Sequence, residues 1–194
     1  MDMREEAATL QFRQERAAGV LGEAAGLARA HWHEVEAQLH GGADYVPDGE
    51  RYAALEKLGM LSVTTARDGE GRLAGYAVFT LAPCPHLKGE TVAALDALYL
   101  APEARHGLNA LALLRSAEAA VAARGASLVQ YSSPASRPCD ALYRRLGATH
   151  TETIWHKRFL KEEAGSSARS KPDEENSTFR LERSGRRVRV PEGS

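Results

Sequence analysis

Two side chains stand out as groups that could take up a proton. Asp96 lies within the apolar run TVAALDALYL at residues 91–100, and a carboxylate in an apolar strand is seldom there for packing. His86 follows two prolines in the preceding loop, and an imidazole titrates near neutral pH. Both are therefore candidate catalytic bases. The alternatives are a structural hydrogen bond or a solvated strand start for Asp96 and a surface loop position for His86.

The polar pair His33 and Glu34, near the end of a helical stretch, is a third candidate for the base. Residues 31–34 cannot all share one face of a helix, so the alternative is a set of surface polar side chains around a buried Trp32. His33 and Glu36 are three residues apart, but no third ligand is evident. A metal site is therefore not expected.

Composition narrows the classes of function. The 194 residues are 43% hydrophobic and carry a net charge of −1, so the chain can bury a core but has no global field to hold nucleic acid or a membrane surface. Cys84 and Cys139 belong to no CxxC pair or Cys/His cluster, which favours reduced thiols. The first residues are polar, and no apolar run approaches the roughly 20 residues of a membrane span. We therefore expect a cytoplasmic protein without a membrane partner.

The spacing of apolar residues predicts the elements that would position these groups. Helices are expected at residues 15–39, 50–58, 108–124 and 136–146, with Ser136 a candidate N-cap of the last. Strands are expected at residues 61–66, 73–80, 91–100, 127–132 and 151–159. The first two strands flank an Asp-Gly turn and predict an antiparallel hairpin.

This order of elements is typical of an α/β fold in which a mixed sheet is flanked by helices. The strands at 91–100 and 127–132 are expected to run parallel, because a helix connects them. We expect an N-terminal extension at 1–14, one domain at 15–160 and a charged tail at 161–194. Within the tail, residues 178–190 alternate in a way that fits either a short hairpin or disorder.

The segment 96–114, DALYLAPEARHGLNALALL, combines a strand, a Pro-Glu-x-Arg loop, a turn of small residues and a helix. A helix N-terminus presents unpaired N–H groups and a partial positive charge, which suit a pyrophosphate. Small residues allow the phosphate to approach the backbone. The segment resembles the acetyl-CoA-binding motif of the GNAT acetyltransferase superfamily.

That resemblance implies a set of residues that hold acetyl-CoA. The strand end would pair with the pantetheine arm, the loop would take the pyrophosphate, and a backbone N–H near Leu100 would polarise the thioester carbonyl. In the family pattern a glycine stands at the position of Leu108, whereas Gly107 lies one place earlier and Ala110 fits. The implied cofactor-binding residues are Leu98, Tyr99, Leu100, Arg105, His106, Gly107, Leu108, Asn109 and Ala110.

A second segment, ALYRRLGA at 141–148, resembles another part of the same family pattern. The resemblance places Tyr143 near the sulfur of CoA, where a phenol would donate a proton to the leaving thiolate. The alternative is that Tyr143 packs its helix against the sheet. The resemblance also implies that His86 borders the acceptor site and that an acidic residue near Asp96 is common in the family.

The function implied is transfer of an acetyl group from acetyl-CoA to the amino group of a small molecule or a protein, by a monomer or homodimer. A narrower similarity, through stretches such as GRLAGYAVF at 71–79, is to GNAT proteins of bacteriophages. One alternative is therefore modification of DNA bases, to which an arginine cluster at 180–189 would contribute. Another is a non-catalytic module that binds acyl-CoA or a partner, which the departure at Leu108 favours.

Overall fold

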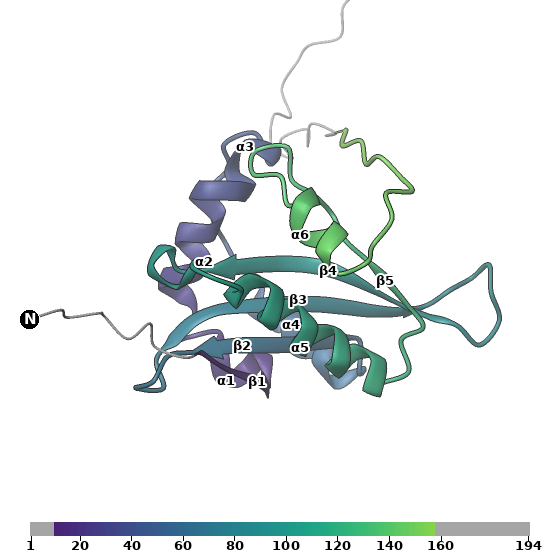
Figure 1. Ribbon diagram of the computed structural model, residues 1–194, viewed down its shortest axis with the longest axis horizontal. Helices are drawn as coiled ribbons and strands as arrows, with labels where there is room; N and C mark the ends of the chain where they lie inside the picture. Colours follow the sequence, from purple (N-terminus) through teal and green to yellow (C-terminus); the bar gives the residue numbers. More distant parts are fainter. Residues whose placement is uncertain (1–9, 158–194) are drawn as a thin grey trace, which may run out of the picture. The chain divides into compact units, whose positions relative to one another are not determined.

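Five strands form one mixed sheet in the computed structural model, which describes residues 10–157 (Figure 1). Their order in the sheet is β1-β2-β3-β4-β5; neighbours among the first four are antiparallel, and β5 runs parallel to β4. The predicted α/β class, the hairpin and the parallel crossover are confirmed. The strands are β1 (Gln11–Glu15), β2 (Leu61–Arg67), β3 (Leu73–Pro83), β4 (Thr91–Leu100) and β5 (Leu128–Gln130).

Helices cover both faces of the sheet. The side chains of β3 alternate: Phe79 and Leu81 join one core cluster with Leu113 and Leu114 of α5, and Tyr76 joins a second cluster on the opposite face. Figure 1 shows α5 lying across the sheet. The helices are α1 (Ala17–Val20), α2 (Ala25–His31), the π-helix η1 (Trp32–Glu36), α3 (Ala37–Leu39), α4 (Gly49–Lys57), the 3-10 helix η2 (Pro102–Ala104), α5 (Asn109–Ala123) and α6 (Asp140–Arg145).

Local signals explain the elements that were predicted well. The carboxylate of Asp68 accepts hydrogen bonds from the amides of Glu70 and Arg72, at 3.0 and 2.9 Å, and closes the turn between β2 and β3. The carboxylate of Asp48 accepts from the amide of Arg51 at 2.9 Å and caps α4. Both turns are held by bonds that span at most four residues, so the sequence pattern is sufficient to predict them.

The N-terminal boundary differs from the expectation, because residues 11–15 form strand β1 rather than an extension. Arg67 of β2 explains the difference. Its nearly buried guanidinium contacts the carboxylates of Glu15, at 2.6 and 2.9 Å, and Glu23, at 2.8 Å. Arg67 holds the pKa of Glu15 at about 2. This ion-pair group ties β1 and the following turn to the sheet.

The helix predicted at 15–39 is broken in the structure. Short helices α1 and α2 are followed by the π-helix η1 and by α3. Gly19, Gly22 and Gly26 lower the helix propensity of this stretch, and π-turns often re-aim side chains at functional sites. Here the break directs Glu34 toward Arg105 of the loop after β4.

Two C-terminal predictions are wrong. Helix α6 begins at Asp140 rather than 136, because Pro138 disfavours helix at the preceding residue and Ser136 donates its hydrogen bond to the carbonyl of Val35 instead. Residues 151–157 form no strand, since β5 offers an edge of only three residues.

The chain divides into two units after Ile154. The tail at 161–194, with its candidate hairpin at 178–190, lies outside the described residues.

The structure describes residues 10–157 of the chain. None of its helices is both long and apolar enough to span a bilayer.

Candidate functional site

Asp96 occupies a β-bulge in β4. Val78 of β3 pairs with Ala97, and the next residue, Phe79, pairs with Leu95, so Asp96 has no partner. The extra residue reverses the alternation of β4: Leu95 belongs to the core on the α5 face, whereas Ala97 and then Tyr99 belong to the opposite face. A bulge of this kind re-aims side chains at sites.

Two cavities meet at this bulge, and both are lined by Asp96, Ala97, His31 and Glu36. The first, of about 230 Å³, lies under α1, α2 and α4; we call it the tyrosine cavity, because Tyr45, Tyr52 and Tyr76 line it. The second, of about 190 Å³, follows Leu95–Leu100 and reaches α6; we call it the β4-edge cavity. A reacting group in either cavity can therefore approach the same carboxylate.

The β4-edge cavity exists because β4 and β5 separate. The two strands pair only over Val92–Ala94 and Leu128–Gln130. Beyond Ala94 the edge of β4 faces the irregular segment that contains Ser132, Pro134 and Arg137, which lines the cavity. An unpaired strand edge presents backbone N–H and C=O groups that can pair with an extended ligand. The predicted residues Leu98, Tyr99 and Leu100 all line this edge.

The loop before α5 ends beside the same cavity. Gly107 has a φ of 58°, a conformation that glycine adopts without strain, and it turns the chain into α5 at Asn109. The side-chain amide of Asn109 donates to the carbonyl of Ala104 at 3.0 Å and fixes the loop. Ala110 lines the cavity. The first amides of a helix have no partner within it, so this end of α5 is suited to an anion.

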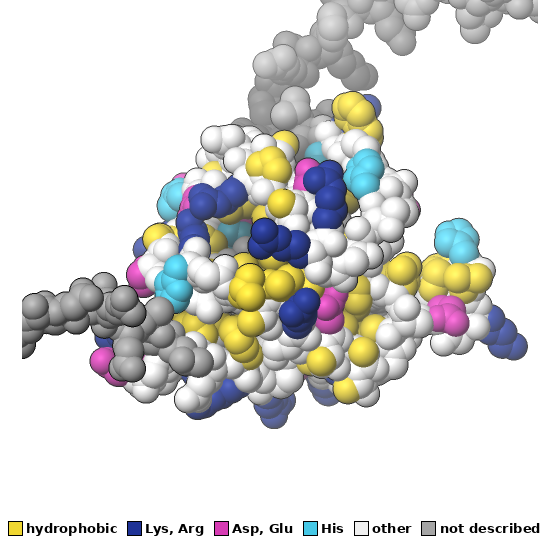
Figure 2. All heavy atoms as spheres, in the orientation of Figure 1, with side chains coloured by type: hydrophobic (Ala, Val, Ile, Leu, Met, Phe, Trp, Pro, Cys, Tyr) yellow, Lys and Arg dark blue, Asp and Glu magenta, His cyan; other side chains and the backbone are white. Residues whose placement is uncertain are grey.

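Arg105, predicted to be a cation for a phosphate, is engaged with other groups. Its guanidinium donates to both carboxylate oxygens of Glu34, at 2.7 and 2.6 Å, and to the carbonyl of Leu100 at 2.7 Å. It also lies 4.9 Å from the ring centroid of Tyr99. Arg137 reaches the same Glu34. The π-helix, the loop before α5 and the segment before α6 are joined by these contacts. Figure 2 shows basic side chains gathered over this region of α2 and α6.

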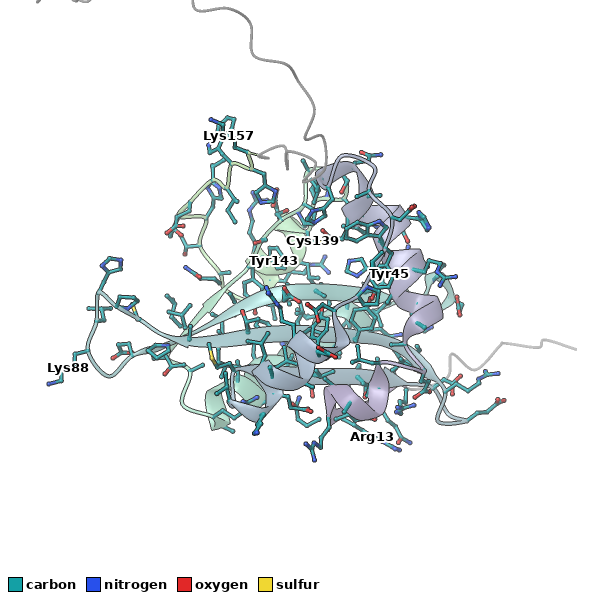
Figure 3. All side chains as sticks on the ribbon, turned by 180° about the vertical axis from the view of Figure 1, so that it is seen from behind. Arg13, Tyr45, Lys88, Cys139, Tyr143 and Lys157 are labelled. Carbon is teal, nitrogen blue, oxygen red and sulfur yellow. The ribbon has the colours of Figure 1, made fainter. Side chains whose placement is uncertain are left out.

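Tyr143 lies on α6 and lines the β4-edge cavity. Its ring stacks on Tyr131 with 4.6 Å between centroids, and its hydroxyl donates to the carbonyl of Ser132 at 2.8 Å. Burial raises the pKa of Tyr143, so the phenol keeps its proton. Figure 3 shows Tyr143 beside Cys139, with Tyr45 across from them near α2.

The carboxyl group of Asp96 is in contact with solvent and is also partly enclosed by protein atoms. The residue is exposed toward the cavities, yet the protein atoms around it displace enough water to raise its pKa. A carboxylate with a raised pKa is a stronger base than an ordinary aspartate. Asp96 as the catalytic base stays a prediction, and its side chain lies where both cavities reach it.

His86 is not brought to this site. It is exposed in the loop that joins β3 and β4 and lines neither cavity. This loop projects from one end of the sheet, with Lys88 at its tip, away from Tyr143 (Figure 3). The structure therefore gives no support to His86 as a catalytic base, because β3 and β4 extend well past the bulge before the loop begins.

His31 lines both cavities and was not selected from the sequence. Its imidazole stacks on Tyr99 with 5.0 Å between centroids, and its Nδ1 lies 3.0 Å from the hydroxyl of Tyr76. Burial and the charge of Arg105 lower the pKa of His31 to about 4, so it is neutral at pH 7. Its neighbour His33, which was considered, lines neither cavity. The spacing of apolar residues did not reveal which histidine faces inward, because the π-helix begins immediately after His31.

Among residues 10–157, no group of three or more His, Cys, Asp or Glu side chains is placed so that it could hold a metal ion.

Comparison with solved structures identifies the architecture. A ribosomal-protein-alanine N-acetyltransferase from Brucella melitensis biovar Abortus 2308 matches 79% of this chain and 99% of its own, with 20% identity and a TM-score of 0.64. The chain has the GNAT acetyltransferase fold. An aminoglycoside acetyltransferase from an uncultured soil metagenomic sample matches 79% of this chain and 99% of its own, at 19% identity and a TM-score of 0.60.

A third match is to glucosamine-6-phosphate N-acetyltransferase from Arabidopsis thaliana, over 78% of this chain and 99% of the other, at 10% identity and a TM-score of 0.57. No protein-family model and no curated protein sequence matches the chain. At these identities the likeness establishes the GNAT fold.

Proposed function

We propose that this protein is an N-acetyltransferase that moves an acetyl group from acetyl-CoA to a primary amine. The observation that carries the proposal is the position of Asp96 at the junction of the two cavities. One cavity fits the acyl donor and the other the acceptor, so the base stands where the two substrates meet.

The β4-edge cavity has the features that acetyl-CoA requires. The unpaired edge at Leu98–Leu100 can hydrogen-bond with the amides of the pantetheine arm. The turn formed by His106, Gly107 and Leu108 leads to Asn109 and Ala110 at the start of α5, where amides can hold the pyrophosphate. Arg105 and Arg137 add positive charge at the same opening, although Glu34 offsets part of it.

The reaction then assigns a role to each group. The amine enters as an ammonium ion, and Asp96 accepts its proton. The neutral nitrogen attacks the thioester carbonyl; the new C–N bond forms, the C–S bond breaks, and the second proton of the nitrogen is released to solvent as the amide forms. Tyr143 donates its phenolic proton to the departing thiolate and regains one from solvent. Before that step its hydroxyl is held toward the carbonyl of Ser132, which orients the phenol at the end of the cavity.

Calorimetric titration with acetyl-CoA tests the donor site. We compare Ala110→Asp with Ala110→Asn, which are nearly equal in size and differ in charge. An acidic residue in the first turn of a helix stabilises it, so Ala110→Asp retains the fold while repelling the pyrophosphate. Binding by the wild type and by Ala110→Asn, with a loss of about tenfold or more in Ala110→Asp, is expected.

An assay for acetyl transfer to amines separates the enzyme from a non-catalytic module. Acetyl-CoA binding without turnover on any amine would support a binding module, and absence of binding by the folded protein would refute the donor site. The narrower similarity to bacteriophage proteins stays a prediction. So does DNA-base modification, since the arginine cluster at 180–189 lies outside the described residues.

A further inference from the structure

The tyrosine cavity has walls made mostly of rings and small apolar side chains. Trp32, Tyr45, Tyr52 and Tyr76 line it from four separate segments, and alanine, valine and leucine side chains fill the spaces between them. Its volume of about 230 Å³ suits one small organic molecule. A body that is aromatic or aliphatic would bury its surface here with few unsatisfied polar groups.

The charge of the cavity has one sign. Among residues 10–157, the carboxylates that line it are Asp96 and Glu36, and no lysine or arginine of this range lines it. His31 stays neutral at pH 7, and His40 is already 3.4 Å from Glu36. An ammonium group is therefore attracted, whereas a carboxylate or phosphate on the acceptor would enter without a partner.

The rings are held in place before any ligand binds. The indole of Trp32 donates to the carbonyl of Ala43 at 2.7 Å and stacks on His40 with 4.9 Å between centroids. The hydroxyl of Tyr76 lies 3.0 Å from His31. Burial, and after it the charge of Asp96, raises the pKa of the Tyr52 phenol to about 12. Tyr52 and Asp96 line the same cavity, so an ammonium bound at Asp96 lies within aromatic walls that can add cation–π attraction.

From these observations we infer that the acceptor is a small monocationic primary amine with an apolar or aromatic body and no acidic group. Its ammonium lies at Asp96, and its body lies among Trp32, Tyr45, Tyr52 and Tyr76. The inference rests on the proposed function, because it assumes that the tyrosine cavity holds the acceptor. It separates this protein from an enzyme for sugar phosphates, whose acceptors need a cation in the cavity.

The test compares four acceptors with the full-length protein and acetyl-CoA. They are 2-phenylethylamine, phenylalanine, glucosamine 6-phosphate and a short peptide with a free N-terminal alanine. We expect kcat/KM for 2-phenylethylamine to exceed that for phenylalanine by about tenfold or more, because the added carboxylate faces Asp96 and Glu36. Equal or higher kcat/KM with phenylalanine, with the sugar phosphate or with the peptide overturns the inference.

Variants locate the effect in the cavity. Tyr52→Ala is expected to raise KM for 2-phenylethylamine about fivefold or more through loss of the ring, with little change in KM for acetyl-CoA. Glu36→Gln should narrow the preference for 2-phenylethylamine over phenylalanine. Lys57→Ala, at an exposed position of the same helix as Tyr52, is the control and retains activity. Unchanged KM in Tyr52→Ala would contradict the assignment.

Calorimetry with 2-phenylethylamine alone distinguishes the two proposals. If the protein binds 2-phenylethylamine saturably, Tyr52→Ala weakens this binding and no amine is acetylated, the amine-binding site is supported and the proposed acetyltransferase function is refuted. Acetylation that favours glucosamine 6-phosphate would keep the enzyme and refute the amine class. If the protein neither binds nor acetylates 2-phenylethylamine, the inference about the class of amine is also refuted.

Discussion

Arg105 and Glu34, 71 residues apart in sequence, form a two-pronged ion pair with N–O distances of 2.7 and 2.6 Å. Glu34 also contacts Arg137, and it accepts from the hydroxyl of Tyr99 at 3.0 Å. One carboxylate therefore offsets one of two cations beside the β4-edge cavity, and it fastens the π-helix over the strand that would carry the pantetheine arm.

Removing the charge of Glu34 should strengthen the attraction of the site for anions. Glu34→Gln is expected to tighten acetyl-CoA binding about two- to threefold at low ionic strength. Salt at about 0.5 M should screen this gain in affinity. Titrations at low and high salt measure it. Weaker binding at low salt would show instead that the position of Arg105 matters more than the local charge.

Asp96→Asn should lower kcat by about 100-fold or more, because a positioned base contributes on that scale. The wild-type rate should fall as pH drops through the pKa of Asp96, which burial raises above its ordinary value, since the protonated carboxyl cannot accept a proton. The pH–rate profiles of the wild type and of Glu103→Gln, an exposed control, provide the comparison. A variant with full activity would remove Asp96 from the mechanism.

Tyr143→Phe keeps the stacked ring and loses the hydroxyl that donates to Ser132. We expect kcat to fall about tenfold or more while KM for the amine changes little, because the lost proton donor serves the leaving thiolate. The free energy of unfolding should fall by about 1 kcal/mol with the hydrogen bond. Thermal unfolding beside steady-state kinetics measures both effects, and an unchanged kcat would assign Tyr143 to packing alone.

His31 makes stability depend on pH. The pKa of His31 falls from 6.5 to about 4 on folding. Between pH 4 and pH 6.5 the imidazole is therefore protonated in the unfolded chain and neutral in the folded protein. Stability is therefore lost as pH falls from 6.5 toward 4, by up to about 3 kcal/mol. Groups that face the imidazole are Tyr76, Tyr99, Glu36 and, through its charge, Arg105. Denaturant titrations of His31→Gln should show a weaker loss over this range; an equal loss would contradict the assignment.

Gly75 permits the close approach of β3 to the functional end of β4. A Cβ atom at this position would lie 2.5 Å from the carbonyl oxygen of Tyr99 and 2.5 Å from a methyl group of Leu100. Gly75→Ala should therefore lower the free energy of unfolding by about 2 kcal/mol or more and weaken acetyl-CoA binding. Gly26→Ala, in α2 with open space around it, is the control and should stabilise slightly. Equal stability of the two variants would contradict the proposed strain.

Some of this architecture could be predicted because its causes are local. The Asp68 turn and the Asp48 cap are each held by bonds within four residues, and helix α5 follows the apolar spacing through Leu114 and Val121. A turn of small residues before this helix was also expected, and Gly107 makes it with a φ of 58°. Strand β1 was missed, since its partner β2 lies about fifty residues away and Arg67 holds it from there.

The pattern of residue types was sufficient to predict the α/β class, a helix at 108–124 that the structure has at Asn109–Ala123, and a carboxylate within an apolar strand. Three-dimensional packing was needed to show that Asp96 lies in a bulge where two cavities meet, that His31 faces inward and that His86 does not. This is because a bulge depends on the register of two strands, and a cavity depends on side chains from distant segments. Neither relationship is carried by the spacing of residues along one element.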